Sequence, residues 1–449
     1  MKKTVDLLIL GGLVGTMDPA YTTIPDGAIA LDHGIIVEIG SRRELEDRYE
    51  AQTVVEASGR VVFPGLVISH THMPSVVGHN MPVDFSKFHD FMDLLTKWWW
   101  PDIEDQTTPE DIYWTTLFAS MKMLKAGTTC VGEMVEAPMA LPGCLDASAR
   151  ALEEIGLRAV VAFEATERIS QENGRLGIEE NLRFVKERNT PASRIRGRFG
   201  LHTVDTCSPQ MIQVVRQLAG ENGAGIFIHV SEIPPSLTVA TRGTTAVRLL
   251  DQLGCLGPDV LAVHCIHLDE EEMDLLAASD VKVAHTPMSN MLGGNGVSPI
   301  PDMLDRGITV SIGHDCFFTL DTFEYLRAAY LIHKVHRQNP GLVPPNQALE
   351  MVTSKGARAL GLDAEVGSLE VGKRADLIVV KPQGPTPVIP ATLMPFMVSD
   401  VNGRDVETVV VDGRVVVDQG RVVTVDEEKV TRRCIERSSA LWRRAGAID

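Results

Sequence analysis

The chain has 449 residues, of which 44% are hydrophobic and 23% are charged, and its formal net charge is −18. This length accommodates one large domain and a smaller one, and the composition is that of an ordinary globular enzyme. Nucleic acids and anionic membranes require a basic face, so the acidic balance argues against both as partners and favours a small-molecule substrate.

The seven cysteines are scattered along the chain and include no Cys-x-x-Cys pair. An odd number of cysteines without a disulfide framework indicates a reduced protein, which we expect in the cytoplasm. The apolar stretch near the N-terminus is interrupted by Asp6 and is typical of a strand and turn rather than of a signal peptide. No apolar run reaches the length of a membrane span.

Residues 4–60 are rich in Val, Ile, Gly and Asp and show little helical periodicity, which predicts short strands. From residue 61 onward, short apolar runs alternate with helical segments such as 111–124, 145–154 and 211–219. Eight strands, each followed by a helix, is the count of a (β/α)₈ TIM barrel, so we predict an α/β barrel domain over residues 61–365. The expected strands are 67–69, 128–131, 159–161, 199–201, 226–228, 261–263, 281–283 and 309–312.

The last part of the chain returns to the composition of the first. Residues 366–425 are again rich in Val, Gly and Asp, and Asp412-Gly413 separates two valine runs, which is a strong hairpin signal. We therefore predict a small β-sandwich domain built from both chain ends, residues 1–60 and 366–425, beside the barrel. A C-terminal helix is expected in residues 426–449.

The strongest local signal follows the first expected barrel strand, where His70 and His72 are separated by one residue. Residues at i and i+2 of a strand point to the same face, which at the end of a barrel strand is the barrel interior. Two imidazoles there suit a metal ion of borderline softness such as zinc. By itself the pair is equally compatible with two polar residues that end a strand.

Further chemically competent side chains end other expected strands. His229 ends the fifth strand, Glu232 follows three residues later, His264 ends the sixth strand and Asp315 ends the eighth. The carboxyl ends of barrel strands meet at one mouth, where barrel enzymes place their chemistry. We interpret these residues, together with the histidine pair, as one metal-dependent active site.

These residues belong to motifs that occur in order along nearly the whole chain and resemble the amidohydrolase superfamily, in its branch of aromatic deaminases and triazine hydrolases. The resemblance implies a hydrolase acting on the C–N bonds of cyclic amidines, an aminohydrolase that releases ammonia. The motifs are Pro64-Gly65-Leu66, His70-Thr71-His72, Ala126-Gly127-Thr128-Thr129, His229-Val230-Ser231-Glu232, His264-Cys265-Ile266-His267-Leu268, His285-Thr286-Pro287-Met288-Ser289-Asn290, Gly313-His314-Asp315 and Gly367-Ser368-Leu369-Glu370-Val371-Gly372-Lys373-Arg374-Ala375-Asp376-Leu377.

The resemblance also implies a site with one divalent metal ion, Zn²⁺ or alternatively Fe²⁺. Its ligands would be His70, His72, His229 and Asp315. The resemblance also implies three catalytic residues. His264 would contact the reacting water, and Asp315 would accept the proton of this water and orient it. Glu232 would carry a proton to the ring nitrogen and to the leaving amine. This agrees with the general chemistry, because a divalent metal lowers the pKa of water toward about 7 and a carboxyl group can serve as general acid and base.

Two features depart from the family pattern. His314 stands where relatives commonly carry a small or hydroxyl residue, and Cys316-Phe317-Phe318-Thr319 replaces an expected loop of Gly, Ala and Ser. Both leave the metal ligands intact but predict an altered substrate pocket beside the metal-site aspartate. His202 ends the fourth strand in place of a lysine, which argues against a binuclear site with a carbamylated lysine.

Within the family, deaminases of S-adenosylhomocysteine and 5′-methylthioadenosine are the most similar. The resemblance implies three substrate-binding residues: Glu104 on the ribose hydroxyls, His202 over the base and Arg175 on an amino-acid tail. Phe163 stands where those relatives often have a second arginine. This favours 5′-methylthioadenosine, adenosine or 5′-deoxyadenosine over S-adenosylhomocysteine.

Several alternatives stay open at this point. Another amino-substituted ring, such as an s-triazine, guanine or an oxidised purine, would use the same metal site. Guanine deaminases tend to carry a Gln shortly after the second histidine of the pair, and no such Gln follows His72, which disfavours guanine. A non-catalytic, purine-binding barrel is a more distant reading. Trp98-Trp99-Trp100 could form a wall of the pocket or pack on the barrel rim. Relatives are often dimers or tetramers, which implies a homo-oligomer.

Overall fold

The computed structural model describes residues 2–315 and 318–449. Its central element is a ring of eight parallel strands, each hydrogen-bonded to the next. A parallel bridge between Thr71 and Asp315 joins the last strand region to the first, and the Ser69 and Ser311 hydroxyl oxygens lie 2.7 Å apart across the same seam. The strands are β8 (Leu66–Thr71), β9 (Thr128–Val135), β10 (Arg158–Ala165), β12 (Phe199–Thr203), β13 (Ile226–Val230), β14 (Val260–His264), β15 (Lys282–His285) and β16 (Val310–Ile312).

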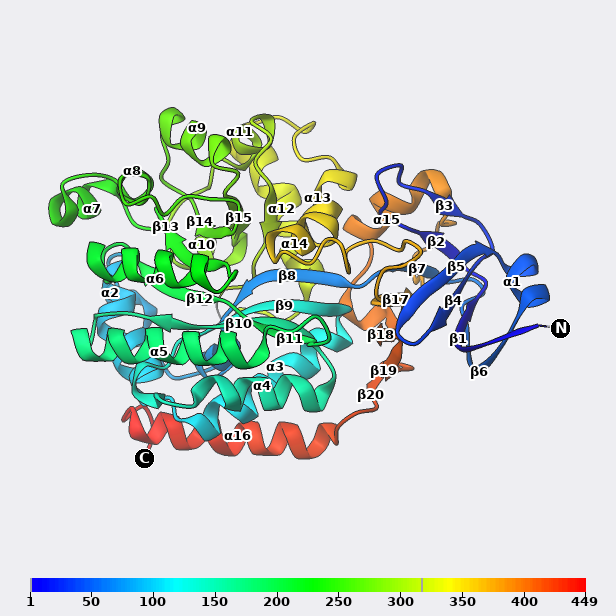
Figure 1. The fold of residues 1–449 in the computed structure, drawn as a ribbon, viewed down its shortest axis with the longest axis horizontal. Helices are drawn as coiled ribbons and strands as arrows, with labels where there is room; N and C mark the ends of the chain where they lie inside the picture. The colour runs from blue at the N-terminus through cyan, green and yellow to red at the C-terminus, as the bar shows by residue number, and fades with distance from the viewer. Residues whose placement is uncertain (1, 316–317) are drawn as a thin grey trace.

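Helices surround this ring, as Figure 1 shows. The three segments expected to be helical lie in α3, α4 and α6, and α3 begins at a capping box in which Thr108 and Asp111 satisfy each other's backbone N–H groups. The eight expected strands all coincide with barrel strands, which confirms the TIM barrel. The helices are α3 (Pro109–Lys125), α4 (Cys144–Ile155), α5 (Gln171–Arg188), α6 (Pro209–Glu221), α7 (Pro235–Arg242), α8 (Ala246–Gln252), α9 (Glu270–Ala278), α10 (Pro287–Leu292), α11 (Ile300–Asp305), α12 (Thr322–His336), α13 (Pro345–Met351) and α14 (Ser354–Ala359).

Two further sheets from the chain ends lie beside the barrel, on the right in Figure 1. Their facing sides share a hydrophobic core in which Ile9 and Ile29 of one sheet pack with Val62, Leu377 and Val410 of the other. The first sheet has the order β5 (Ile35–Ser41), β4 (Gly27–Asp32), β1 (Lys3–Leu10) and β6 (Tyr49–Glu56). The second has the order β20 (Arg421–Val422), β19 (Arg414–Asp418), β18 (Val406–Val411), β17 (Leu377–Val380), β7 (Val61–Pro64), β2 (Leu13–Gly15) and β3 (Thr23–Ile24).

This packing confirms a β-sandwich made from both chain ends. The hairpin expected at Asp412-Gly413 joins β18 to β19, and both residues have the positive φ angles, 52° and 74°, that a tight type I′ turn needs. β7, which follows the expected boundary at residue 61, belongs to the sandwich because it pairs with β17. The exact domain bounds stay a prediction.

The C-terminal helix α16 (Glu427–Arg444) runs along the outside of the barrel next to α3 (Figure 1). Its Arg437 and Arg444 both pair with the fully buried carboxylate of Asp111, and Trp442 donates a hydrogen bond to the carbonyl oxygen of Val77 at 2.7 Å. The helix thereby holds the segment that follows the first barrel strand. No helix in the described ranges has the length and apolar character that crossing a membrane requires.

A buried ion pair joins the barrel to the sandwich. Arg158 Nε and Asp376 Oδ2 lie 2.9 Å apart, with side chains only 4% and 2% exposed. Replacing Arg158 with methionine leaves a buried carboxylate without its cation, so we expect a loss of about 3–5 kcal/mol in the free energy of unfolding. The control Arg306→Met breaks pairs with exposed carboxylates on α9 and should cost under about 1 kcal/mol. Equal urea midpoints for both variants would contradict this prediction.

Candidate active site

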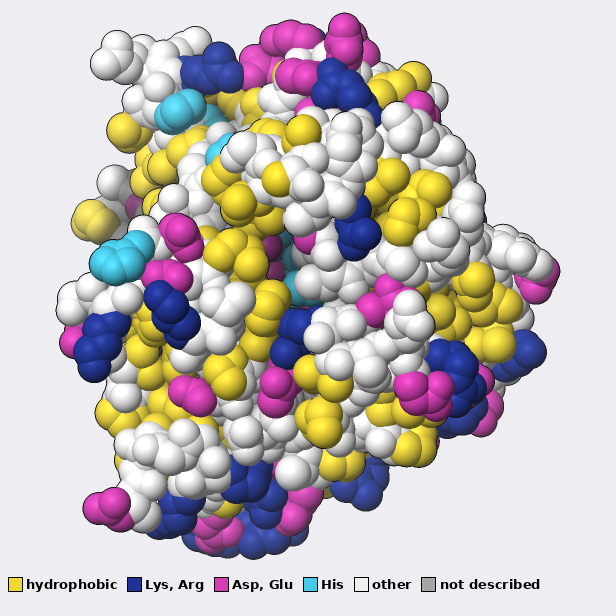
Figure 2. All heavy atoms as spheres, turned by 90° about the vertical axis from the view of Figure 1, so that its left-hand side faces the viewer, with side chains coloured by type: hydrophobic (Ala, Val, Ile, Leu, Met, Phe, Trp, Pro, Cys, Tyr) yellow, Lys and Arg dark blue, Asp and Glu magenta, His cyan; other side chains and the backbone are white. Residues whose placement is uncertain are grey.

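The metal-competent residues meet at the carboxyl ends of the barrel strands. His70 lies in β8 and His72 follows it, His229 lies in β13, His264 ends β14 and Asp315 follows β16. All five side chains are buried. Figure 2 views this face of the molecule, and a hollow near its centre shows histidine and acidic side chains inside. The barrel therefore brings together residues that are up to 245 positions apart in the sequence.

Four of these residues point one atom each at a common centre. The Nε2 atoms of His70, His72 and His229 are 3.1, 3.2 and 3.3 Å from one another. Asp315 Oδ1 lies 3.0, 3.4 and 3.8 Å from these three nitrogen atoms. A tetrahedral zinc ion with bonds of 2.0–2.1 Å has ligand–ligand separations of about 3.3 Å. The four atoms thus fit a divalent metal ion in both identity and spacing.

The far sides of two imidazole rings fix how the rings face this centre. His72 Nδ1 lies 2.7 Å from the carbonyl oxygen of Met134, and His229 Nδ1 lies 3.1 Å from that of His202. A carbonyl oxygen can only accept a hydrogen bond, so both Nδ1 atoms carry a hydrogen, and in the neutral form of each ring the Nε2 atom presents its lone pair to the centre. Glu136 Oε1 is also 2.8 Å from His72 Nδ1. Such carboxylate contacts orient metal-binding histidines and increase their basicity.

The protonation states of two ligands also suit metal binding, whereas at His72 the surrounding carboxylates outweigh burial and raise the pKa well above its usual range, so a metal ion displaces a proton from that ring. Burial lowers the pKa of His70 to about 4, so this ring is neutral. Burial by itself would raise the pKa of Asp315, but the neighbouring imidazoles of His264 and His70 lower it well below its usual range. Ser289 also donates its hydroxyl hydrogen to Asp315 Oδ2. A neutral imidazole and an ionised carboxylate are the forms that coordinate a cation.

Glu232 and His264 lie next to the centre. Glu232 Oε1 is 3.5 Å from His264 Nε2 and accepts a hydrogen bond from the Asn295 side-chain amide at 3.0 Å. Burial raises the pKa of Glu232 to about 7, so this carboxyl group can both hold and release a proton near neutral pH. His264 Nδ1 lies 3.0 Å from the amide oxygen of Asn290, which leaves Nε2 facing Glu232 and Asp315.

The backbone is strained at this mouth of the barrel. Ser231, His264, Cys265 and Asp315 have φ angles of 51°, 69°, 50° and 63°, in the left-handed region that non-glycine residues seldom occupy. Such strain persists where the surrounding structure enforces it, typically at functional sites.

The substrate side of the site is a cavity in front of the metal ligands. One wall is apolar and comes from the segment after the first barrel strand and from α10. The rest of the lining carries carboxylates and His202. The lining residues are His72, Phe91, Leu94, Leu95, Trp99, Glu104, Glu136, Glu164, His202, His229, Glu232, His264, Ser289, Leu292, Gly293 and Asp315.

The three consecutive tryptophans have different surroundings. One of them forms part of the pocket wall, and the others pack outside the cavity. Trp99 lines the cavity and donates its indole hydrogen to Glu136 Oε2 at 2.8 Å. Trp98 packs away from the cavity against Phe85 and Phe88. Trp100 carries the guanidinium of Arg168 at 4.7 Å from its ring centre.

The expected substrate-binding residues are only partly brought together. Glu104, at the start of η4 (Glu104–Gln106), and His202, in β12, both line the cavity. Arg175 does not: its side chain is 54% exposed on the outer face of α5 and pairs with Glu172 and Glu179, one helical turn away on either side. The expectation that Arg175 reaches the substrate is therefore wrong.

Two further expectations need correction. Phe163 packs outward against Gly177 of α5, because side chains alternate along β10 and Glu164 takes the inward position. Residue 163 therefore cannot decide whether the cavity accepts a carboxylate. His314 also points away from the cavity, bonding to the Thr322 hydroxyl at 3.0 Å and stacking on Tyr325. Cys316 and Phe317, expected to alter the pocket, lie outside the described residues.

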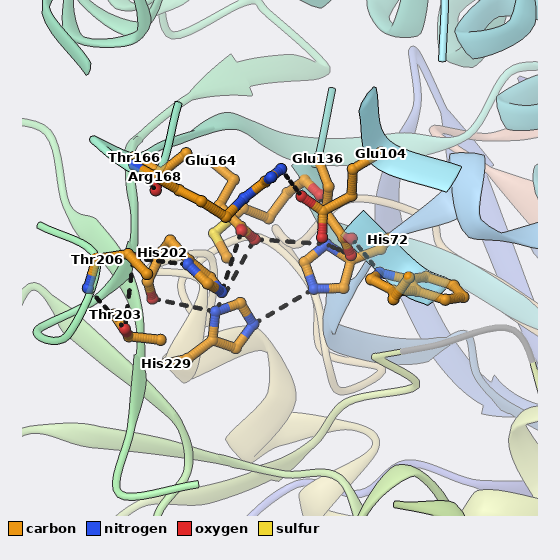
Figure 3. A network of polar contacts seen from close by, with 12 residues as sticks. His72, Glu104, Glu136, Glu164, Thr166, Arg168, His202, Thr203, Thr206 and His229 are labelled. Carbon is orange, nitrogen blue, oxygen red and sulfur yellow. Dashed lines mark hydrogen bonds and ion pairs between the residues drawn. The ribbon is translucent and has the colours of Figure 1, made fainter. Parts of the chain in front are cut away.

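Sequence reasoning missed several residues of the site. Glu136, Glu164 and Ser289 line the cavity, and Arg168 bonds to Glu104 Oε2 at 2.9 Å from behind its wall. Figure 3 shows this network, in which the two inward glutamates lie between His72, His202 and His229. A usable signal existed, since Glu136 and Glu164 lie at the carboxyl ends of the second and third strands, where barrel enzymes place functional groups.

Comparison with known proteins agrees with this site. The family described as "Amidohydrolase family" matches residues 61–416. A 5′-deoxyadenosine deaminase of Methanosarcina acetivorans is 37% identical over 98% of this chain and all of its own. A 5-methylthioadenosine/S-adenosylhomocysteine deaminase of Pelotomaculum thermopropionicum is 36% identical over 98% of this chain and 99% of its own. A zinc-bound adenosine deaminase structure from Xanthomonas campestris has a TM-score of 0.89 at 25% identity and covers 99% of this chain and all of its own.

The chain belongs to the amidohydrolase family. This confirms the expected class, a hydrolase that acts on C–N bonds, and a divalent metal site in the barrel mouth.

Proposed function

We propose that the protein is a hydrolytic deaminase of adenosine-type purine nucleosides, with 5′-deoxyadenosine, 5′-methylthioadenosine and adenosine as candidate substrates. The reaction replaces the ring amine with oxygen from water and releases ammonia. The observation that carries the proposal is the position of Glu232, a carboxyl group whose Oε1 lies 3.5 Å from His264 Nε2 beside the metal ligands, and whose burial raises its pKa to about 7. The two deaminases similar over nearly the full chain support the substrate class.

We assign the metal to His70, His72, His229 and Asp315, and we propose zinc because three imidazoles and one carboxylate suit it. When bound, a divalent metal ion supplies Lewis-acid chemistry that makes water a nucleophile near neutral pH.

The chain's own residues then handle protons and orientation. Glu232 holds a proton in its buried site and can deliver it to the ring nitrogen and afterwards to the departing amine. His264 Nε2 and Asp315 Oδ1, 3.7 Å apart, flank the position where water attacks and orient it. The apolar wall with Trp99 covers an aromatic ring and excludes bulk water. Glu104 and His202 are the proposed contacts to ribose and base.

The test is ammonia release by the zinc-reconstituted protein. The panel holds adenosine, 5′-deoxyadenosine, 5′-methylthioadenosine, S-adenosylhomocysteine, guanine, cytosine and an aminotriazine. We expect kcat/KM for the best adenosine compound to exceed that for any other ring by at least about tenfold, because one missing polar contact in a buried site already costs that much. Release from another ring alone would retain the hydrolytic class and replace the assigned substrate.

A further inference from the structure

A short glycine-rich loop, residues 293–299, connects α10 to α11 and passes beside the catalytic groups that hold no metal. The backbone N–H of Asn295 donates a hydrogen bond to the carbonyl oxygen of Asn290 at 3.0 Å. The Ser298 hydroxyl donates one to the carbonyl oxygen of His264 at 2.7 Å. The loop is therefore held in a defined position against the end of the sixth barrel strand.

The side chain of Asn295 reaches Glu232 from this loop. Its Nδ2 atom lies 3.0 Å from Glu232 Oε1, and within residues 2–315 and 318–449 this is the only hydrogen bond to that carboxyl group. An ionised carboxylate can only accept hydrogen bonds, so the NH2 group of the amide, and not its oxygen, faces Glu232. One of the two oxygen atoms of the proposed proton carrier is thereby fixed.

The glycines of the loop make room for this contact. A Cβ atom at position 293 would lie 2.6 Å from Asn295 Oδ1 and 3.0 Å from the ring of Phe91, so a larger residue there would displace the amide. Gly296 has a φ angle of 117°, which residues with a side chain rarely adopt. Asn295 Oδ1 is buried and accepts no hydrogen bond in the part of the chain that the structure describes. An unpaired buried acceptor destabilises the folded state, so packing alone does not account for an asparagine here.

Asn295 lies close to the substrate cavity without forming part of its wall. Leu292 and Gly293 line the cavity, as Glu232 does, whereas Asn295 is not among the described residues that line it. Asn295 is therefore placed to affect the reaction through Glu232 rather than by contact with the substrate.

We propose that Asn295 is a positioning residue whose NH2 group holds Oε1 of Glu232 as the accepting oxygen, so that the proton transferred in the reaction is carried on Oε2. A protonated carboxyl group has one hydroxyl oxygen, which donates, and one carbonyl oxygen, which accepts. The donor on Asn295 selects between these two forms and fixes the rotation of the carboxyl group toward the cavity. The inference rests on the proposed function, because it concerns the proton carrier of that reaction.

The first test is Asn295→Asp, which keeps the shape of the side chain and replaces the donating NH2 group with an oxygen. We expect kcat for the best substrate of the panel to fall by about 10–100-fold, as the loss of one hydrogen bond to a charged group typically causes. KM should stay nearly unchanged, because the substituted side chain does not line the cavity. The matched control Asn339→Asp makes the same change in an exposed turn, keeps the acceptor for the Gly341 N–H, and should retain full activity.

A second variant, Asn295→Leu, removes the donor without adding a charge and should give the same pattern. A purely structural role predicts a different result. Loosening of the loop would disturb Leu292 and Gly293 in the cavity wall and would raise KM. A raised KM with unchanged kcat in both variants, at full zinc content, would overturn the proposal.

Combining Asn295→Asp with Glu232→Gln tests whether the two residues act as one unit. A residue that acts only through Glu232 has no further effect once that side chain cannot carry a proton. We therefore expect kcat of the double variant to equal that of Glu232→Gln within about twofold. A further loss as large as the loss that Asn295→Asp causes alone would show that Asn295 acts elsewhere.

The outcomes separate this inference from the proposed function. The ranking of substrates by the unaltered protein tests the function, and the kcat ratios test Asn295 on whichever compound is deaminated best. Ammonia release from another ring alone, with the expected ratios, would support the positioning role and overturn the adenosine assignment. Release from an adenosine compound with full kcat in both Asn295 variants would do the reverse. No release from any compound would overturn both.

Discussion

Replacing Glu232 with glutamine is expected to lower kcat at least about 10²-fold while the metal stays bound. The amide has nearly the same size as the carboxyl group but cannot accept and return a proton, and general acid–base catalysis contributes about 10²–10⁴-fold to such reactions. Glu232 does not contribute an atom to the four-atom metal centre. We therefore expect metal content to be unchanged, as measured by elemental analysis beside ammonia release.

A matched control is Glu221→Gln, at the exposed end of α6, which should keep full activity and full metal content. Retained turnover in Glu232→Gln would refute the assigned proton carrier. Loss of metal in the same variant would instead place the Glu232 carboxylate among the groups that hold the ion. In the structure this carboxylate faces His264, with Oε1 3.5 Å from Nε2.

The barrel and the metal ligands could be predicted from the sequence because both leave regular traces. Parallel strands covered by helices are buried on both faces, so β10 and β13 appear as short, continuous apolar runs. The strands end at one mouth, so polar residues such as His229 and Asp315 that directly follow such runs must meet there. Position along the strands grouped these candidate residues at one mouth, and the family resemblance then selected the four ligands among them.

The substrate side could not be predicted in the same way. Arg168 lies in the loop before α5, which turns it toward Glu104, whereas the register of the helix turns Arg175, seven residues later, to solvent. Motif matching detects neither of these orientations. Along β10 a shift of one residue reverses the direction of a side chain, which separates Phe163 from Glu164. Contacts that depend on such local geometry require the folded structure.

Replacing His70 with alanine is expected to remove the metal and with it both activity and part of the stability. The ring is fully buried, and its Nε2 lies 3.0–3.2 Å from the other three ligand atoms. Altering even a residue that only orients a ligand typically costs 10–100-fold in metal affinity, so loss of a ligand should cost at least about 100-fold. Metal content after dialysis against a dilute chelator measures this directly.

The stability effect follows from linkage, since an ion that binds only the folded state stabilises it by about 2.7 kcal/mol when its free concentration is 100 times Kd. Zinc should therefore raise the Tm of the unaltered protein and of the control His33→Ala, whose ring is 88% exposed, but not that of His70→Ala. Comparing the Tm of metal-free His70→Ala with that of the metal-free unaltered protein measures the effect of the cavity left by the missing imidazole, separately from the effect of the missing metal. A zinc-dependent rise in the Tm of His70→Ala equal to that of the unaltered protein would remove His70 from the ligand set, and with it the tetrahedral arrangement on which the whole site depends.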